Sequence, residues 1–296
     1  RQGNYGSDYK VFIDGVQQAI KTTSVSNVAD IATNLIAEDL KADLVTNLGG
    51  GYTITRAGSV VHIKKNTGDF RLTVEDSQGG SSLLCFKDST QNFTTLPTTA
   101  PTGFEITING TADSEYDHYY IRFVPATSGE TFGEGYWEEC VGQGVADTIN
   151  PANMPHVLIR NGDGTFTFKE VDWDAMTAGD STLSPPPSFI GRPINGMYFS
   201  NQRFSLLSGD SIIRSGTGAF FNFFRTTMTT LLDSDPIDYK VSHTKVSNLK
   251  NAVAYDEKVI IVSEQTQFVA QGDTPKTFSV DPSTEFECSP LCAPVG

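Results

Sequence analysis

Long hydrophobic runs are missing from this sequence of 296 residues, and none approaches the roughly 20 apolar residues that cross a bilayer. We therefore expect no membrane-spanning segment. Basic residues are also scarce, because 21 Lys and Arg stand against 35 Asp and Glu and give a net charge of −14. Phosphate contacts require Lys and Arg, and no basic stripe with interleaved aromatic residues is present. The composition excludes a sequence-specific DNA reader. The composition is compatible with duplex DNA as non-specific cargo, because an acidic protein surface would repel the duplex and let it slide past without binding it.

Cysteine is rare as well, and four cysteines in a chain of this length do not make a disulfide framework. Cys85 and Cys140 stand among apolar neighbours, so we expect both to be small buried side chains. Cys288 and Cys292 have no histidine nearby, which argues against a zinc site.

Recognisable catalytic motifs are absent. The sequence has no GxSxG elbow, no HExxH, no P-loop and no dinucleotide-binding glycine fingerprint. The segment Asn161–Gly164 faintly resembles a calcium loop but lacks the closing acidic residue, so we interpret it as a hairpin turn. His156, at the head of a strand, is expected to have a packing or hydrogen-bonding role. The four histidines are scattered without metal-ligand spacing, at His62, His118, His156 and His243.

Paired carboxylates, which serve glycoside hydrolysis, are the one catalytic pattern that the sequence could supply. The candidates are Glu138, Glu139, Asp172 and Asp174. Neighbouring residues of a strand point to opposite faces, so Glu138 and Glu139 do not line one cleft together. We assign no catalytic, cofactor-binding or metal-binding residue and do not expect an enzyme.

The chain reads as a mainly β, multi-domain protein. We expect a small α+β unit over 1–95, a compact β unit over 104–149 and part of a β-propeller over 153–296. The Pro- and Thr-rich segment Thr94–Gly103 is the predicted linker between the first two units. A second break is expected at Asp147–Pro155.

The α+β unit is predicted to begin with a strand at Tyr9–Ile13 and a hairpin turn at Asp14-Gly15. A helix is expected from an Asn27 cap to about Asn47, where glycines stop it. Its predicted core face holds Val28, Ile31, Leu35, Leu40 and Leu44. A second hairpin over 52–64 and a strand over 70–75 complete the unit. In the compact β unit we expect three strands, at Phe104–Ile108, His118–Val124 and Gly135–Cys140.

The last part of the chain contains an internal repeat. Strand and turn signals over Ile194–Gly216 recur over Leu249–Gly272 at an offset of about 55 residues, near the ~50 of long propeller blades. Each copy is predicted to be a three-stranded meander that needs neighbours to bury its faces. Leu206 and Ile261 would occupy equivalent buried positions. Two unrelated meanders remain the alternative.

Five segments in this order carry a resemblance. They are Asn153–Arg160, Ser184–Gly191, Leu206–Asp210, the Phe220–Phe224 run and Asp235–Asp238. Together they resemble the nozzle protein family of short-tailed bacteriophages, and the similarity continues more loosely over most of the chain. Because the chain starts at Arg1 without a Met and ends without a capping element, we expect a piece of a longer polypeptide.

The resemblance implies a structural subunit of the virion tail. Nozzle proteins form a homohexameric ring below the adaptor ring, combine a β-propeller with smaller β domains, and conduct the genome through a central channel. Tail fibres dock near the junction of nozzle and adaptor. The matching segments define the fold, so no catalytic residue is transferred.

Two other functions stay open at this point. One is a receptor-binding or saccharide-binding β protein of a phage tail, which an exposed aromatic cluster in a groove would favour. The other is a polysaccharide hydrolase that uses paired carboxylates.

Overall fold

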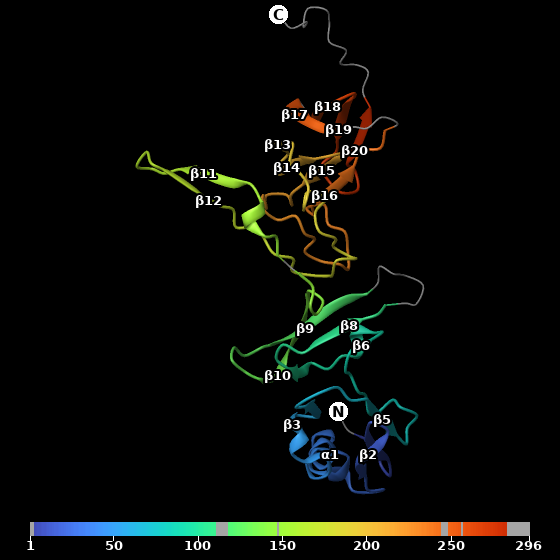
Figure 1. Cartoon of the computed structure of the whole chain (residues 1–296). Coiled ribbons are helices and arrows are strands. Elements are labelled where there is room, and N and C mark those ends of the chain that lie inside the picture. The colour runs from blue at the N-terminus through green and yellow to red at the C-terminus, as the bar shows by residue number, and fades with distance from the viewer. Residues whose placement is uncertain (1–2, 111–117, 147, 244–247, 256, 283–296) are drawn as a thin grey trace, which may run out of the picture. The chain divides into compact units, whose positions relative to one another are not determined.

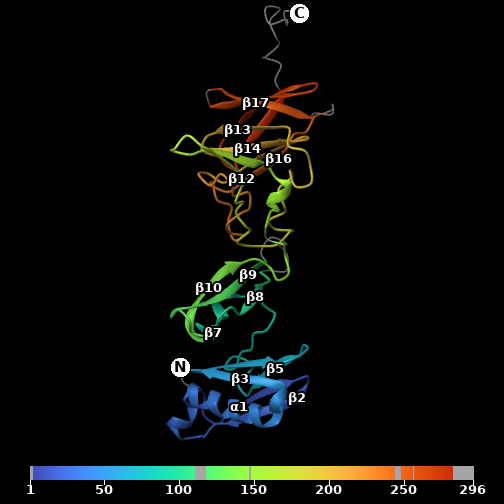
Figure 2. The same ribbon diagram turned by 60° about the vertical axis from the view of Figure 1, so that its left-hand side comes forward.

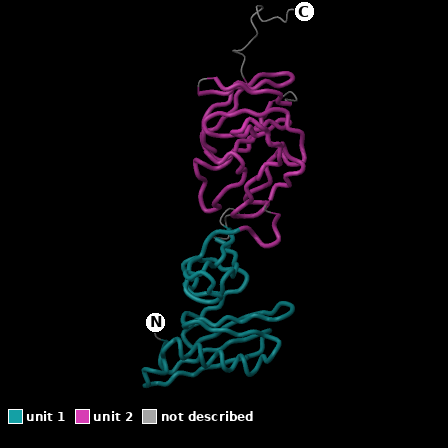
Figure 3. The backbone as a smooth tube through the Cα atoms, turned by 90° about the vertical axis from the view of Figure 1, so that its left-hand side faces the viewer, with its two compact units in different colours: residues 1–140 teal, residues 141–296 magenta. Residues whose placement is uncertain are grey.

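The structure is a computed structural model and describes residues 3–110, 118–146, 148–243, 248–255 and 257–282. The chain forms two compact units, Arg1–Cys140 and Val141–Gly296 (Figure 3). Each is built mainly of antiparallel strands, as the strand and turn signals of the sequence predict. In the described part of the chain no helix has the length and apolar character needed to span a membrane.

The first unit begins with an α+β layer in which one helix covers β-strands (Figure 1). A three-stranded sheet has the order β2-β1-β5, and a separate hairpin pairs β3 with β4. The elements are β1 (Asp8–Ile13), β2 (Val16–Thr22), 3-10 helix η1 (Val28–Ile31), α1 (Thr33–Leu48), 3-10 helix η2 (Gly49–Gly51), β3 (Tyr52–Ala57), β4 (Val60–Lys65) and β5 (Leu72–Asp76). The predicted turn is confirmed, since Asp14 and Gly15 both have positive φ.

The predicted helix is interrupted, which corrects its core face. Asn27 caps the 3-10 helix η1, its side chain accepting a bond from the Ala29 N–H, and Ala32 is then extended with ψ 122°. Since α1 starts afresh at Thr33, its buried stripe is Ile36, Ala37, Leu40 and Leu44. Leu35 and Val28 are exposed, contrary to the prediction.

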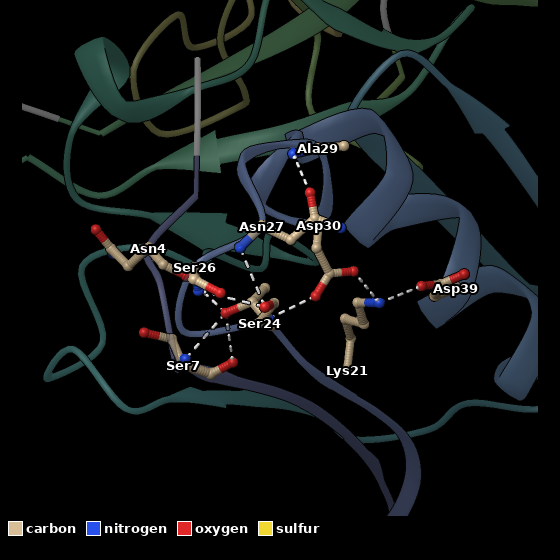
Figure 4. A network of polar contacts seen from close by, with 10 residues as sticks. Asn4, Ser7, Lys21, Ser24, Ser26, Asn27, Ala29, Asp30 and Asp39 are labelled. Carbon is tan, nitrogen blue, oxygen red and sulfur yellow. Dashed lines mark hydrogen bonds and ion pairs between the residues drawn. The ribbon is translucent and has the colours of Figure 1, made fainter.

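A polar network ties η1 and α1 to strand β2 (Figure 4). The Lys21 ammonium lies 2.8 Å from Asp30 Oδ1 and 2.7 Å from Asp39 Oδ2. The second oxygen of Asp30 accepts the Ser24 backbone N–H at 2.5 Å. The hydrogen bond from Lys21, followed by that from Ser24, lowers the pKa of the Asp30 carboxyl. These contacts fix the loop that leads into the helix.

The rest of the first unit is a five-stranded sheet of order β6-β8-β9-β10-β7. Its elements are β6 (Ser89–Thr90), 3-10 helix η3 (Phe93–Thr95), β7 (Thr99–Pro101), β8 (Glu105–Ile108), β9 (Tyr119–Pro125) and β10 (Phe132–Cys140). The three predicted strands are confirmed as β8, β9 and β10 with small shifts of their ends. Gly135 is required on β10, because a Cβ there would stand 2.1 Å from the Val124 carbonyl oxygen.

The predicted linker is not an unstructured connection. Thr99–Pro101 forms β7, which pairs with Phe132–Glu134 of β10. The Trp137 indole N–H also donates to the Pro97 carbonyl at 2.9 Å. Threonine favours extended backbone, and the two prolines do not prevent an edge strand, so a composition typical of linkers here forms a sheet edge.

The second unit contains an isolated hairpin and two four-stranded antiparallel meanders (Figure 2). The hairpin follows the 3-10 helix η4 (Pro151–Asn153) and consists of β11 (His156–Arg160) and β12 (Phe166–Glu170). The first meander contains β13 (Gly196–Ser200), β14 (Arg203–Ser208), β15 (Ser211–Arg214) and β16 (Ile237–Lys240). The second contains β17 (Leu249–Tyr255), β18 (Lys258–Ser263), β19 (Gln267–Gln271) and β20 (Ser279–Pro282).

Each copy of the repeat thus has four strands, one more than predicted. The fourth strands, β16 and β20, are separated from the first three by irregular chain, so a search for closely spaced strands misses them. The Asn201-Gln202 turn is confirmed, since both residues have positive φ.

Two cores enclose the first meander. One face of the β13–β16 sheet packs with the β17–β20 sheet around Leu207, Ile212 and Ile261. Its other face packs on irregular chain through Leu206, Phe189 and Phe223. Every residue of β14 and β15 is buried as a result.

The predicted equivalence of Leu206 and Ile261 can be tested by truncation. Both side chains have 0% exposure, as predicted. We expect Leu206→Ala and Ile261→Ala each to lower the free energy of unfolding by about 2–5 kcal/mol, because each leaves a cavity in a packed core. Chemical denaturation measures this. The control Val262→Ala removes a partly exposed side chain next to Ile261 and should cost clearly less.

The Asp30 network predicts a pH-dependent stability. Because the folded-state pKa of Asp30 lies below the ordinary 3.8, its stabilisation is present above that pH and is lost as the pH falls through the folded value. We expect Asp30→Asn to lower the urea midpoint at pH 7, and the difference from the unmodified chain to shrink below pH 3.8. Asp88→Asn is the control in the same unit, since that side chain is 80% exposed and Lys87 keeps Asp69 as a partner. A difference that persists unchanged at low pH would contradict this role.

Candidate functional site

The four candidate carboxylates do not form a site within either unit. Glu138 on β10 pairs with Arg122 of β9, whose Nη2 lies 2.8 Å from Oε1. Glu139 is the next residue of the same strand, opposite Ile121. Asp172 follows β12 in the second unit, 95% exposed and 3.2 Å from the Lys169 ammonium. Asp174 binds Phe221 through its backbone N–H. In the described residues no three His, Cys, Asp or Glu side chains are grouped to hold a metal ion.

The histidines pack against aromatic rings. The ring of His156 is stacked on Phe168 at 5.1 Å, and its Nδ1 lies 3.1 Å from the Met154 carbonyl oxygen, in agreement with the predicted packing role. The other three make edge contacts: His62 with Phe132, His118 with Tyr120 and His243 with Phe268. Burial lowers the pKa of His62.

The segment Asn161–Gly164 is a hairpin turn, as predicted. The Asn161 N–H donates to the Thr165 carbonyl at 2.8 Å, and Gly164 has a φ of 88°. Asp163 is engaged within the turn, because its Oδ1 accepts bonds from both the backbone N–H and the hydroxyl of Thr165.

The two described cysteines differ. Cys140 is buried, as predicted, and burial raises the pKa of its thiol to about 11. Cys85 is exposed, contrary to the prediction. Cys85 lies in irregular chain between β5 and β6. Apolar neighbours in the sequence were therefore not sufficient to predict its burial. Cys288 and Cys292 lie outside the described residues.

Two buried arginines were not anticipated from the sequence. Arg203 donates at 2.7 Å to the carbonyl oxygens of Ser215, Asp235 and Asp233. Arg214 donates to Ser200 and Gly272, and its guanidinium lies 5.3 Å from the ring centroid of Phe278. Within the described ranges neither has a carboxylate at ion-pair distance. Desolvation, and then the charge of Arg214, lowers the pKa of Arg203. Their bonds hold irregular chain to the β13–β16 sheet, which is a structural role.

The aromatic run Phe220–Phe224 is a set of turns and not a strand. Phe223 and Phe224 enter the core, whereas Phe220 and Phe221 are exposed. Phe189, which follows the Pro185–Pro187 run, is buried, whereas the next residue, Ile190, is exposed.

Exposed apolar side chains gather at three places in the second unit. The first is the β11–β12 hairpin, with Leu158, Phe166 and Phe168. The second is Met197 and Phe199 of strand β13 together with Phe220, whose ring lies 5.5 Å from that of Phe199. The third is the outward face of the β17–β20 sheet, where the exposed Val253 is aligned across three strands with the half-buried Ile260 and Val269. Exposed apolar surfaces of this kind are typical of sites that contact a partner or a ligand.

Comparison with known proteins agrees with this picture. The family model described as bacteriophage nozzle protein matches residues 1–296. The tail tubular protein gp12 of Escherichia phage T7 is 32% identical over 305 aligned residues, which cover 100% of this chain and 37% of that protein. The chain therefore spans little more than a third of the length of this relative.

The family match extends over the same segments that suggested the resemblance, and it includes both compact units. On this evidence the chain belongs to the bacteriophage nozzle protein family.

Proposed function

We propose that this phage tail protein builds the wall of a nozzle through which the genome leaves the virion. The observation that carries the proposal is the family match over the whole chain. The structure adds support, since it is made mainly of sheets and exposes apolar surfaces suited to assembly.

A partial β-propeller is the architecture that best fits the second unit. Its two meanders each have four antiparallel strands, the number typical of a propeller blade, and they pack face to face. Val253, Ile260 and Val269 leave the outward face of the second sheet apolar. A further sheet of the same propeller would cover that face, as each blade covers the next.

The charge of the chain suits a channel that conducts DNA without holding it. With a net charge of −14, the surface repels phosphate and releases no counterions on contact with a duplex. DNA is then a non-specific cargo. The energy that moves it does not have to overcome binding to the wall.

The ring we propose is a homohexamer. Its partners would be the adaptor ring above it and the tail fibre protein near that junction. These assignments rest on the family, and the apolar patches provide surface for such contacts. A receptor-binding or saccharide-binding protein of the tail is the alternative, and saturable binding of a sugar by the chain would favour it.

The channel proposal predicts that the chain binds duplex DNA very weakly. We expect dissociation constants weaker than micromolar at about 50 mM salt, and no detectable binding at about 200 mM. Fluorescence anisotropy with a labelled duplex measures both. Micromolar affinity that persists at the higher salt concentration would contradict the proposal that the channel surface repels DNA.

The ring proposal predicts how association depends on chain length. A ring requires one patch of a subunit to meet a different patch of the next. We expect the 296-residue chain alone to be monomeric or weakly associating at micromolar concentration. The full-length protein should form rings, most of them hexamers, alone or together with its adaptor. Light scattering on both proteins tests this. A full-length protein that stays monomeric with its adaptor would favour the saccharide-binding alternative.

A further inference from the structure

The β11–β12 hairpin, here called the arm, consists of residues 156–170 and is a two-stranded sheet to which no third described strand adds (Figure 1). Leu158 lies directly opposite Phe168 in the register, and Phe166 is on the same face two residues away. These three side chains are 63%, 71% and 61% exposed. A two-stranded ribbon with an uncovered apolar face is marginally stable in water, so such a face is a candidate for burial in a contact.

Contacts within the arm hold its conformation although its apolar face is exposed. The His156 ring stacked on Phe168 orients the apolar face near its base. At the tip, Asn161 Nδ2 donates to the hydroxyls of Thr165 and Thr167 at 2.9 and 3.0 Å. These bonds close the turn and hold the strands in register, so little conformational entropy is lost when the arm is buried.

The charge of the arm favours a second copy of this chain as the occupant. The chain carries a net charge of −14, which separates copies in solution. The arm itself has as many basic as acidic residues, namely Arg160 and Lys169 against Asp163 and Glu170. A neutral, apolar arm approaches an acidic neighbour without the repulsion that the rest of the surface generates.

The same chain also presents a second exposed surface that is apolar and aromatic like that of the arm. Met197 and Phe199 extend the buried core of the β13–β16 sheet to the surface, and Phe199 contacts Phe204 and Phe220. We call Met197, Phe199 and Phe220 the receiving patch. One chain therefore carries two unlike apolar surfaces, which is what a closed ring of identical subunits requires.

We infer that the arm of one subunit docks on the receiving patch of the next. Phe166 and Phe168 then pack against Phe199 and Phe220, and the arm buries its apolar face between copies. This inference rests on the ring proposed above and names the contact that closes it.

Photocrosslinking of the full-length protein in its assembled form tests the contact. Phe168→benzoylphenylalanine places a photoreactive ring on the arm, and Val25→benzoylphenylalanine places one on an exposed site in the first unit as a control. We expect the arm probe to give covalent dimers, with mass spectrometry mapping the linkage to 197–220 of a second copy. The control should give none to that segment. Linkage only within one chain, or to another segment, overturns the inference.

A variant pair provides an independent readout. Phe166→Ser with Phe168→Ser should weaken ring formation by about tenfold or more, because truncated aromatic anchors dominate interface energies. Phe199→Ser on the receiving patch should act in the same direction. The control Val25→Ser also removes an exposed apolar side chain, but outside both surfaces, and should have no effect on ring formation. If the unmodified protein forms rings and the arm variant forms them equally well, the arm inference fails while the ring stands. If the unmodified protein forms no ring, the proposed function fails first.

Discussion

The β13–β16 sheet has apolar side chains on both faces, so both faces must be covered before the sheet is stable. The second unit meets this requirement with the β17–β20 sheet on one side and with irregular chain around Phe189 and Phe223 on the other. The buried Arg203 holds the irregular chain at Asp233 and Asp235 through their carbonyl oxygens, and the buried Arg214 binds the carbonyl oxygen of Gly272 between β19 and β20. A buried cation needs such acceptors, and the bonds in turn fix the loops that supply the carbonyl oxygens. The outer face of β17–β20 is also apolar and must be covered in the same way, which is why we propose further blades.

The β framework was predictable because strand and turn signals are local. The hairpin at Asp14-Gly15, the turn at Asn161–Gly164 and the burial of Leu206 and Ile261 all follow from short patterns. What sequence patterns missed depends on contacts between distant residues. The fourth strand β16 pairs only after the long irregular segment 215–236, β20 follows the shorter segment 272–278, and β7 forms because β10 offers it an edge. The break in the first helix at Ala32 likewise reflects the fixed loop around Asp30 and Lys21. The division into three domains over 1–95, 104–149 and 153–296 stays a prediction beside the two compact units.

The proposed contact surfaces were less accessible to prediction than the fold. An exposed Phe and a core Phe look alike in a sequence, and the Phe220–Phe224 run contains both. Alternation on β12 predicts which side chains share a face, but not that no other strand covers it. The two arginines carry no signal at all, since Arg is most often a surface residue. The family assignment, in contrast, rested on several short segments in a fixed order, and the whole-chain match agrees with it.

A continuous ring with an open axis is the central claim, and an electron cryomicroscopy reconstruction of the full-length protein addresses it most directly. The account predicts sixfold particles with a central hole that admits a DNA duplex. In each subunit another sheet of the same chain should cover the outer face of β17–β20. Particles without rotational symmetry, or a ring closed at its axis, would contradict the account.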